Sequence, residues 1–159
     1  MTVITPTASG GDPTQTYTFS VPRWRGFDTP FGDIWTNLDG VVIYKTAANE
    51  PSNVYTSTTE FTDEIGTKTI AGVEIASDGY TTAYDLGETG EMIPSRVGGS
   101  ESTYMCDYHY CNAGSTALRT LLVGGDASNG GQAGVGCFLS SGPVSHVFAA
   151  VGFRTLNVI

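Results

Sequence analysis

The sequence is short of charge, and above all of positive charge. Only 14% of its 159 residues are charged, and 7 Lys and Arg stand against 16 Asp and Glu, which leaves a net charge of -9. A chain of this sign repels the phosphate backbone of nucleic acids. A nucleic-acid partner is therefore disfavoured.

Long hydrophobic runs are also missing. No apolar stretch approaches the roughly 18 residues that a membrane-spanning helix needs, and the first sixteen residues lack the basic start and the apolar stretch of a signal peptide. We expect a soluble chain that is made in the cytoplasm and does not insert into a membrane.

Motifs of catalysis and metal binding are sparse. The chain has no Gly-x-Ser-x-Gly elbow, Walker loop, dinucleotide-binding glycine pattern or zinc-protease helix. Cys106, His109 and Cys111 are zinc-ligand types, but a strand would turn Cys106 away from the other two, and a closed site needs four ligands. With Cys137 the cysteines number three, so we expect reduced thiols rather than a disulfide framework. The sequence predicts a non-enzymatic protein without metal or cofactor.

What the chain does contain is enough for one core. Its length suits a single domain, and 40% hydrophobic residues with 21 glycines indicate a loop-rich globular fold. Residues 1–15 are rich in Thr, Gly and Pro and predict a flexible lead or linker. We expect a single domain over residues 16–159.

Alternating apolar and polar residues predict strands, and no long stripe of helical period lies between Lys45 and Pro94. We interpret Asp39-Gly40 as a turn before a buried strand. The expected strands are Tyr17–Val21, Val41–Tyr44, Thr69–Ala76, Ser102–Tyr110, Ala117–Gly124 and Val144–Arg154.

Two blocks carry a family resemblance. "RGFDTPFGDIWTNLDGVVI" and "RVGGSESTYMCDYHY", the latter followed by "LLVGGDASNGGQAGVGCFLSS" and "VGFR", resemble the C-type-lectin-fold module of tailed-phage virion proteins. Several such modules are targets of diversity-generating retroelements. The resemblance implies an α+β, C-type-lectin-like fold that is rich in strands and loops and has little helix.

The phage modules are distantly related to formylglycine-generating enzymes, whose copper site uses two cysteines. Counted from Gly124-Gly125, those two positions fall on Asn129 and Gly134 here. The resemblance therefore implies no copper-dependent oxidation.

The resemblance implies a virion protein on the head or tail surface that binds a host-surface glycan or protein. An alternative from another class is a decoration protein that binds only neighbouring virion subunits. Trp24, Phe27, Phe31 and Trp35 are either core residues or a subunit contact, and analogy with fibre tips favours a homo-oligomer, most plausibly a trimer.

The glycine-rich stretch after Gly124 predicts a display surface, because glycines let the chain fold flat between strands. Short polar side chains on a stiff loop suit a neutral glycan or a polar epitope, and an ordinary solvated loop is the alternative. The proposed contacts are Asp126, Ser128, Asn129, Gln132, Ser140, Ser141, Ser145 and His146, and the candidate core residues nearby are Ala133, Val135, Val144, Val147, Phe148 and Val151.

Overall fold

The chain forms two units in the computed structural model, Met1–Pro30 and Phe31–Ile159. The structure describes residues 2–3, 17–18, 23–24, 27–28, 30–145 and 147–152. In the first unit, β1 (Thr2–Val3) pairs antiparallel with β2 (Tyr17–Thr18), and β3 (Arg23–Trp24) pairs antiparallel with β4 (Phe27–Asp28).

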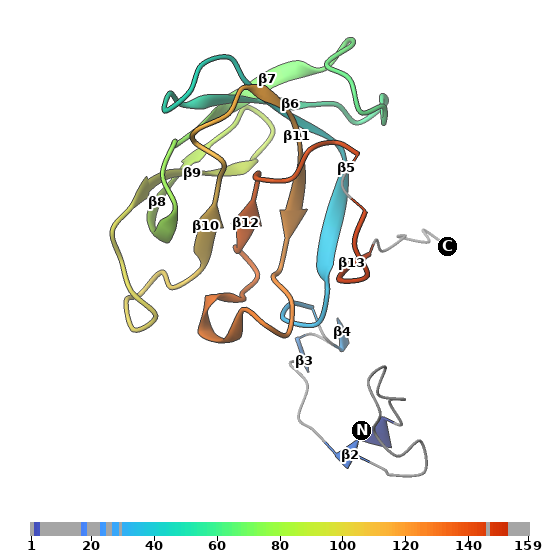
Figure 1. Cartoon of the computed structure of the whole chain (residues 1–159), viewed down its shortest axis with the longest axis vertical. Helices are drawn as coiled ribbons and strands as arrows, with labels where there is room; N and C mark the ends of the chain where they lie inside the picture. Colours follow the sequence, from blue (N-terminus) through green and yellow to red (C-terminus); the bar gives the residue numbers. More distant parts are fainter. Residues whose placement is uncertain are drawn as a thin grey trace. The chain divides into compact units, whose positions relative to one another are not determined.

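One nine-stranded sheet forms the second unit, in the order β7-β6-β5-β11-β12-β10-β8-β9, with β13 paired to β5 (Figure 1). Most neighbours are antiparallel; β10 with β12 and β13 with β5 are parallel. The strands are β5 (Trp35–Lys45), β6 (Ser52–Thr56), β7 (Thr69–Glu74), β8 (Gly79–Leu86), β9 (Met92–Val97), β10 (Tyr108–Tyr110), β11 (Ala117–Val123), β12 (Phe138–Leu139) and β13 (Val151–Gly152).

The two edges of this sheet, β7 and β9, approach each other and nearly close it into a barrel. Beyond β7, the backbone N–H of Ile75 donates to the carbonyl of Pro94 at 3.0 Å. Gly72 makes the close approach possible, since a Cβ there would lie 2.6 Å from Cδ1 of Ile93. Near closure leaves few unpaired backbone groups at the edges.

Strand alternation places one set of side chains inside the barrel. Ile43, Val54, Ile93, Leu121 and Phe138 come from five different strands and form one buried cluster. Because these strands are distributed around the nearly closed sheet, the cluster of their side chains fills the barrel interior. Each buried aliphatic side chain of this kind stabilises the fold by about 1.5–3 kcal/mol.

A second core lies on the outer face of β5, β11, β12 and β10. Trp35, Leu122 and Cys137 are buried there, with partly buried side chains packed against them from Tyr108, Tyr110, Leu139 and Val151. Leu121 faces the barrel interior and Leu122 faces this outer core, which is why "LLV" in β11 is apolar on both sides.

Asp39-Gly40 does not turn the chain. β5 continues through it as a bulge, because Val42 pairs with Thr120 while Leu38 pairs with the next residue, Leu121. Gly40 has a φ of +78°, and a Cβ there would lie 2.5 Å from the carbonyl oxygen of Ser57. The prediction that Asp39-Gly40 is a turn before the buried strand is wrong, because β5 runs through both residues.

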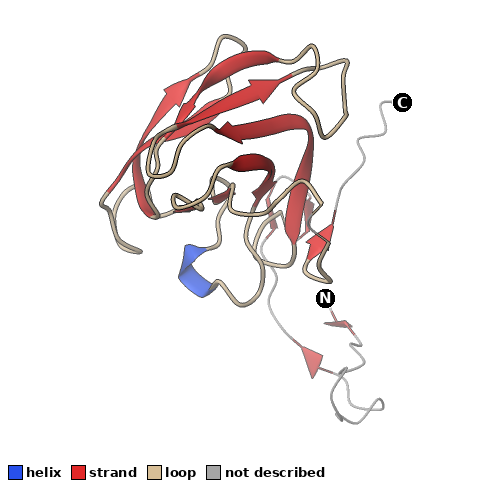
Figure 2. Cartoon of the chain, turned by 45° about the horizontal axis from the view of Figure 1, so that its top comes forward, coloured by secondary structure: helices blue, strands red, loops and turns tan. Residues whose placement is uncertain are grey.

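The expected α+β class is also wrong. The structure is 43% strand and 2% helix (Figure 2), and its only helical element among the described residues is the 3-10 turn η1 (Gly130–Gln132). The physical reason is visible in the sequence, which has glycine-rich loops and no sustained 3.6-residue apolar stripe that a helix could bury. In the part of the chain that is described, no helix has the length and apolar character to cross a membrane.

Two strand predictions extended far beyond the strands that form. The strand predicted for Ser102–Tyr110 is β10 alone, and Tyr104 and Cys106 are exposed in the preceding loop. Of the strand predicted for Val144–Arg154, only Val151–Gly152 is a strand among the described residues. Val135, Val147 and Phe148, expected in the core, are 69%, 90% and 60% exposed. Periodicity over so few residues does not distinguish a strand from a loop with mixed exposure.

Candidate functional site

The glycine-rich loop between β11 and β12, residues 125–136, is held by its own polar side chains. One carboxylate oxygen of Asp126, Oδ1, accepts hydrogen bonds from the Ser128 backbone N–H at 2.8 Å and from its hydroxyl at 2.6 Å. Oδ1 of Asn129 accepts from the Asp126 N–H at 2.7 Å. Such side-chain-to-backbone bonds fix a loop without secondary structure.

Tyr110 anchors this loop to the barrel. Nδ2 of Asn129 donates to the Tyr110 hydroxyl at 3.3 Å, and that hydroxyl donates to Oε1 of Gln132 at 2.5 Å. Burial, reinforced by Cys137, raises the pKa of Tyr110 to about 12. The phenol is therefore protonated at neutral pH and can act as a hydrogen-bond donor. Asn129 and Gln132 therefore position the loop, while Ser128 is its exposed polar side chain.

The second half of the predicted contact set is dispersed. Ser140 is 1% exposed, and its hydroxyl donates to Oε1 of Glu74 at 2.9 Å inside the barrel. The carbonyl of Ser141 accepts from Nη1 of Arg119 at 2.8 Å, and Ser145 is exposed. His146 lies outside the described residues. The structure thus brings Asp126, Ser128, Asn129 and Gln132 together and separates them from Ser140.

The loop between β9 and β10, residues 98–107, lies beside the 125–136 loop. A Cβ on Gly131 would lie 3.4 Å from Oε2 of Glu101, and Thr103 closes the β9–β10 loop through its hydroxyl, which is 2.7 Å from the carbonyls of both Ser100 and Met105. Tyr104 is fully exposed at its tip. We call residues 98–106 and 125–136 the loop face. Tyr104 was not among the predicted contacts, because the alternation of residues 102–110 predicted a strand there.

Deep inside the barrel, Glu74 and His109 form a buried pair. Both side chains are 0% exposed, and Oε2 of Glu74 lies 3.4 Å from Nε2 of His109. Nδ1 of His109 lies 2.9 Å from the carbonyl of Ser77, which can only accept, so Nδ1 carries a proton. The contact with Glu74 then needs one further proton between the carboxylate and Nε2.

Lys45 lies near this pair. It follows Ile43 by two residues and so points into the barrel, where its ammonium has no hydrogen-bond partner among the described residues. Burial raises the pKa of the Cys111 thiol to about 12; Asp78 and Glu74 add to the rise, and Lys45 opposes it. The charges of Asp78, Glu74 and Lys45 thus lie around the Cys111 thiol. We call Lys45, Ser52, Glu74, His109, Cys111 and Ser140 the polar end of the barrel.

The opposite end of the barrel interior contains a cavity of about 420 Å³, which we call the mouth cavity. Its walls are mainly aliphatic and aromatic, and four side chains supply polar groups: Thr56, Tyr84, Glu91 and Asp107. The apolar lining is Leu38, Val41, Val54, Met92, Ile93, Leu121, Val123, Val135 and Phe138, with Gly136. The loop face contributes Val135 and Gly136, so it borders this cavity.

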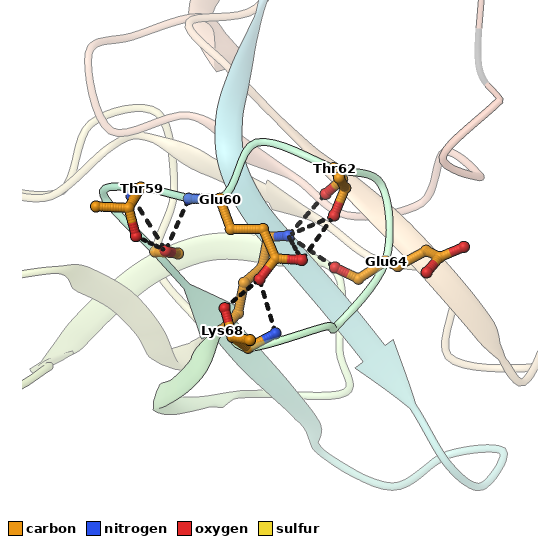
Figure 3. Close-up of polar contacts among 7 residues, drawn as sticks. Thr59, Glu60, Thr62, Glu64 and Lys68 are labelled. Atoms are coloured by element: carbon orange, nitrogen blue, oxygen red, sulfur yellow. Dashed lines mark hydrogen bonds and ion pairs between the residues drawn. The ribbon is translucent and has the colours of Figure 1, made fainter.

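A third polar cluster lies in the loop between β6 and β7, residues 57–68 (Figure 3). The buried ammonium of Lys68 donates to the carbonyls of Thr62 and Glu64, each at 2.7 Å. Glu60 accepts from the Thr67 backbone N–H at 2.7 Å and from the Thr67 and Thr62 hydroxyls. Those bonds, led by the Thr67 hydroxyl, lower the pKa of Glu60 to about 2. The charges of Glu60 and Lys68 both have partners within the loop, so we interpret the cluster as structural.

All three cysteines are unpaired. Within the described residues, no three His, Cys, Asp or Glu side chains are placed to hold a metal ion. Comparison with family models, with curated proteins and with solved structures found no match.

Proposed function

We propose that the chain is a non-enzymatic virion surface module that contacts the host through its loop face. The sequence resemblance supplies the virion setting. The observation that carries the binding role is a loop tip on a rigid support: Tyr104 is fully exposed beside a loop whose polar side chains bond to one another and to Tyr110. Tyrosine suits such a role, since it offers a large contact area and a polar hydroxyl at low entropic cost.

Ser128 and Tyr104 are the contact residues that this geometry favours. Asn129 and Gln132 act indirectly by keeping Ser128 in place. Glu101 adds a carboxylate to the same face, which together with the net charge of -9 makes a strongly anionic polysaccharide a poor ligand.

The test is attachment of the labelled protein to intact bacterial cells and to an array of bacterial surface polysaccharides. Tyr104→Ala/Ser128→Ala should reduce attachment at least about tenfold, the effect of losing one or two contact side chains. Its matched control is Phe61→Ala/Thr58→Ala, which removes an exposed aromatic and an exposed hydroxyl side chain from the 57–68 loop and should bind normally. Equal loss in both variants, or no loss in a folded Tyr104 variant, contradicts the proposal.

The decoration-protein alternative has one observation in its favour. Leu86 and Met92 pair across the β8–β9 hairpin and are 74% and 59% exposed, a pair of apolar side chains that a neighbouring subunit would cover. The same surface suits the predicted homo-oligomer. Light scattering at micromolar concentration should give three chains per particle, and Leu86→Ser/Met92→Ser should shift it to monomer; a monomeric parent chain contradicts the oligomer prediction.

A further inference from the structure

The mouth cavity has the features of a small-molecule site. This site is separate from the contact residues proposed on the loop face. Its volume of about 420 Å³ falls within the roughly 300–1,000 Å³ of ligand pockets, which combine apolar walls with a few polar groups. Among its four polar side chains, Thr56 and Tyr84 donate their hydroxyl protons within the protein and Glu91 accepts several hydrogen bonds, whereas the Asp107 carboxylate accepts a single one.

Glu91 is used by its own hairpin. Its carboxylate accepts from the Thr89 hydroxyl, from the Thr89 N–H at 3.1 Å and from the Thr56 hydroxyl at 3.2 Å. Those bonds, led by the Thr89 hydroxyl, lower the pKa of Glu91, so it is ionised at neutral pH. The Tyr84 hydroxyl donates to the carbonyl of Gly136 at 3.3 Å.

Asp107 is the exception. It is half-buried, lines the cavity and accepts a hydrogen bond from the Gly136 backbone N–H. No other bond to its carboxylate is recorded within the described part of the chain. A carboxylate offers about four acceptor positions, so Asp107 keeps acceptor capacity beside an apolar cavity.

The chain accommodates this carboxylate by having glycine at two positions. A Cβ on Gly136 would lie 2.7 Å from Oδ2 of Asp107, and a Cβ on Gly134 would overlap Oδ1. Burial also raises the pKa of Asp107, which means that its charge weakens the fold at neutral pH. The Asp107 carboxylate lowers the stability of the fold, and glycines at 134 and 136 leave space for it. This combination points to a ligand-binding role.

Charge complementarity identifies that ligand. The lining contains two carboxylates, Asp107 and Glu91, and contains no Lys, Arg or His. We propose that the mouth cavity binds a small lipophilic amine, with its apolar body among the aliphatic side chains and its protonated nitrogen on the Asp107 carboxylate.

The probe is n-octylamine, compared with 1-octanol and octanoate by isothermal titration calorimetry on the intact chain. Octylamine should bind most tightly, octanol about tenfold more weakly because a charge-assisted bond is lost, and octanoate should not bind because its carboxylate faces Asp107. Equal binding of octylamine and octanol would overturn the assignment of a cationic group, and no binding of any probe would overturn the site.

Two variants locate the site. Asp107→Asn should weaken octylamine about tenfold and leave octanol unchanged, whereas Asp85→Asn, an exposed carboxylate on β8, should change neither. Val123→Phe fills the cavity and should abolish both. Unchanged octylamine binding in either Asp107→Asn or Val123→Phe overturns the proposal. Because Tyr104 and Ser128 do not line the cavity, failure here leaves the loop-face result untouched, and the reverse also holds.

Discussion

The two ends of the barrel interior are built by the same strands and differ completely in chemistry. On β5, Val41 faces the mouth cavity and Lys45 the polar end; on β10, His109 lies at the polar end and Asp107 precedes the strand at the mouth. The polar end buries charges near one another and covers them, while the mouth keeps a carboxylate beside apolar walls. Removing one member of a buried charged pair is costly, whereas a charge facing a cavity is available to a ligand.

The largest effect is expected from Glu74→Ala. It leaves the Ser140 hydroxyl and His109 without their shared partner, and loss of one member of a buried charged pair costs about 3–5 kcal/mol. Urea denaturation measures it, with exposed Glu88→Ala as the control. A loss below about 1 kcal/mol would mean that the polar end does not stabilise the fold.

Lys45→Met tests the same end in the opposite direction. The ammonium of Lys45 has no hydrogen-bond partner in the described part of the chain, so replacing it with an apolar chain of similar length should raise the free energy of unfolding by about 1 kcal/mol. Destabilisation in urea would instead show that the attraction between Lys45 and Glu74 outweighs the desolvation of the ammonium.

At the mouth, Asp107→Asn should stabilise the protein modestly at pH 7, by less than about 1 kcal/mol because the group is only half-buried. The folded state raises the pKa of Asp107 above its ordinary value of 3.8. For a carboxyl group with a raised pKa, the folded protein loses stability as pH rises from 3.8 through the raised pKa. Thermal melts should therefore show a gain at pH 7 that disappears well below pH 3.8, and a gain independent of pH would refute the electrostatic cause.

The smallest effect is expected at Glu60, outside both ends. Its pKa is lowered from 4.5 to about 2, so its contribution is present above pH 4.5 and lost as pH falls toward 2. Glu60→Gln should slightly lower the melting temperature at pH 7 and match the parent chain at pH 2. The opposite pH profiles of Glu60→Gln and Asp107→Asn separate a structural carboxylate from a ligand-facing one; parallel profiles would remove that distinction.

Prediction from the sequence succeeded where apolar and polar side chains alternate along a segment that is paired within the sheet. The strands predicted for Ala117–Gly124 and Thr69–Ala76 are present as β11 and β7, each slightly shorter than predicted. It failed at Ser102–Tyr110, where alternation continues through a loop, and over Val144–Arg154. Of the candidate site, the link among Asp126, Ser128 and Asn129 is local in sequence and was within reach, whereas the mouth cavity joins residues from Leu38 to Phe138 and left no local signal.

By itself the sequence determined the lack of a long apolar stripe of helical period between Lys45 and Pro94, the strand that contains Val41–Tyr44, and the excess of acidic groups. These properties depend on a residue and its near neighbours. Only the tertiary structure decided which end of the barrel receives which polar group. Strand register does this: moving a strand by one residue would turn Ile43, Lys45 or His109 out of the interior, and register is set by pairing between segments far apart in the chain.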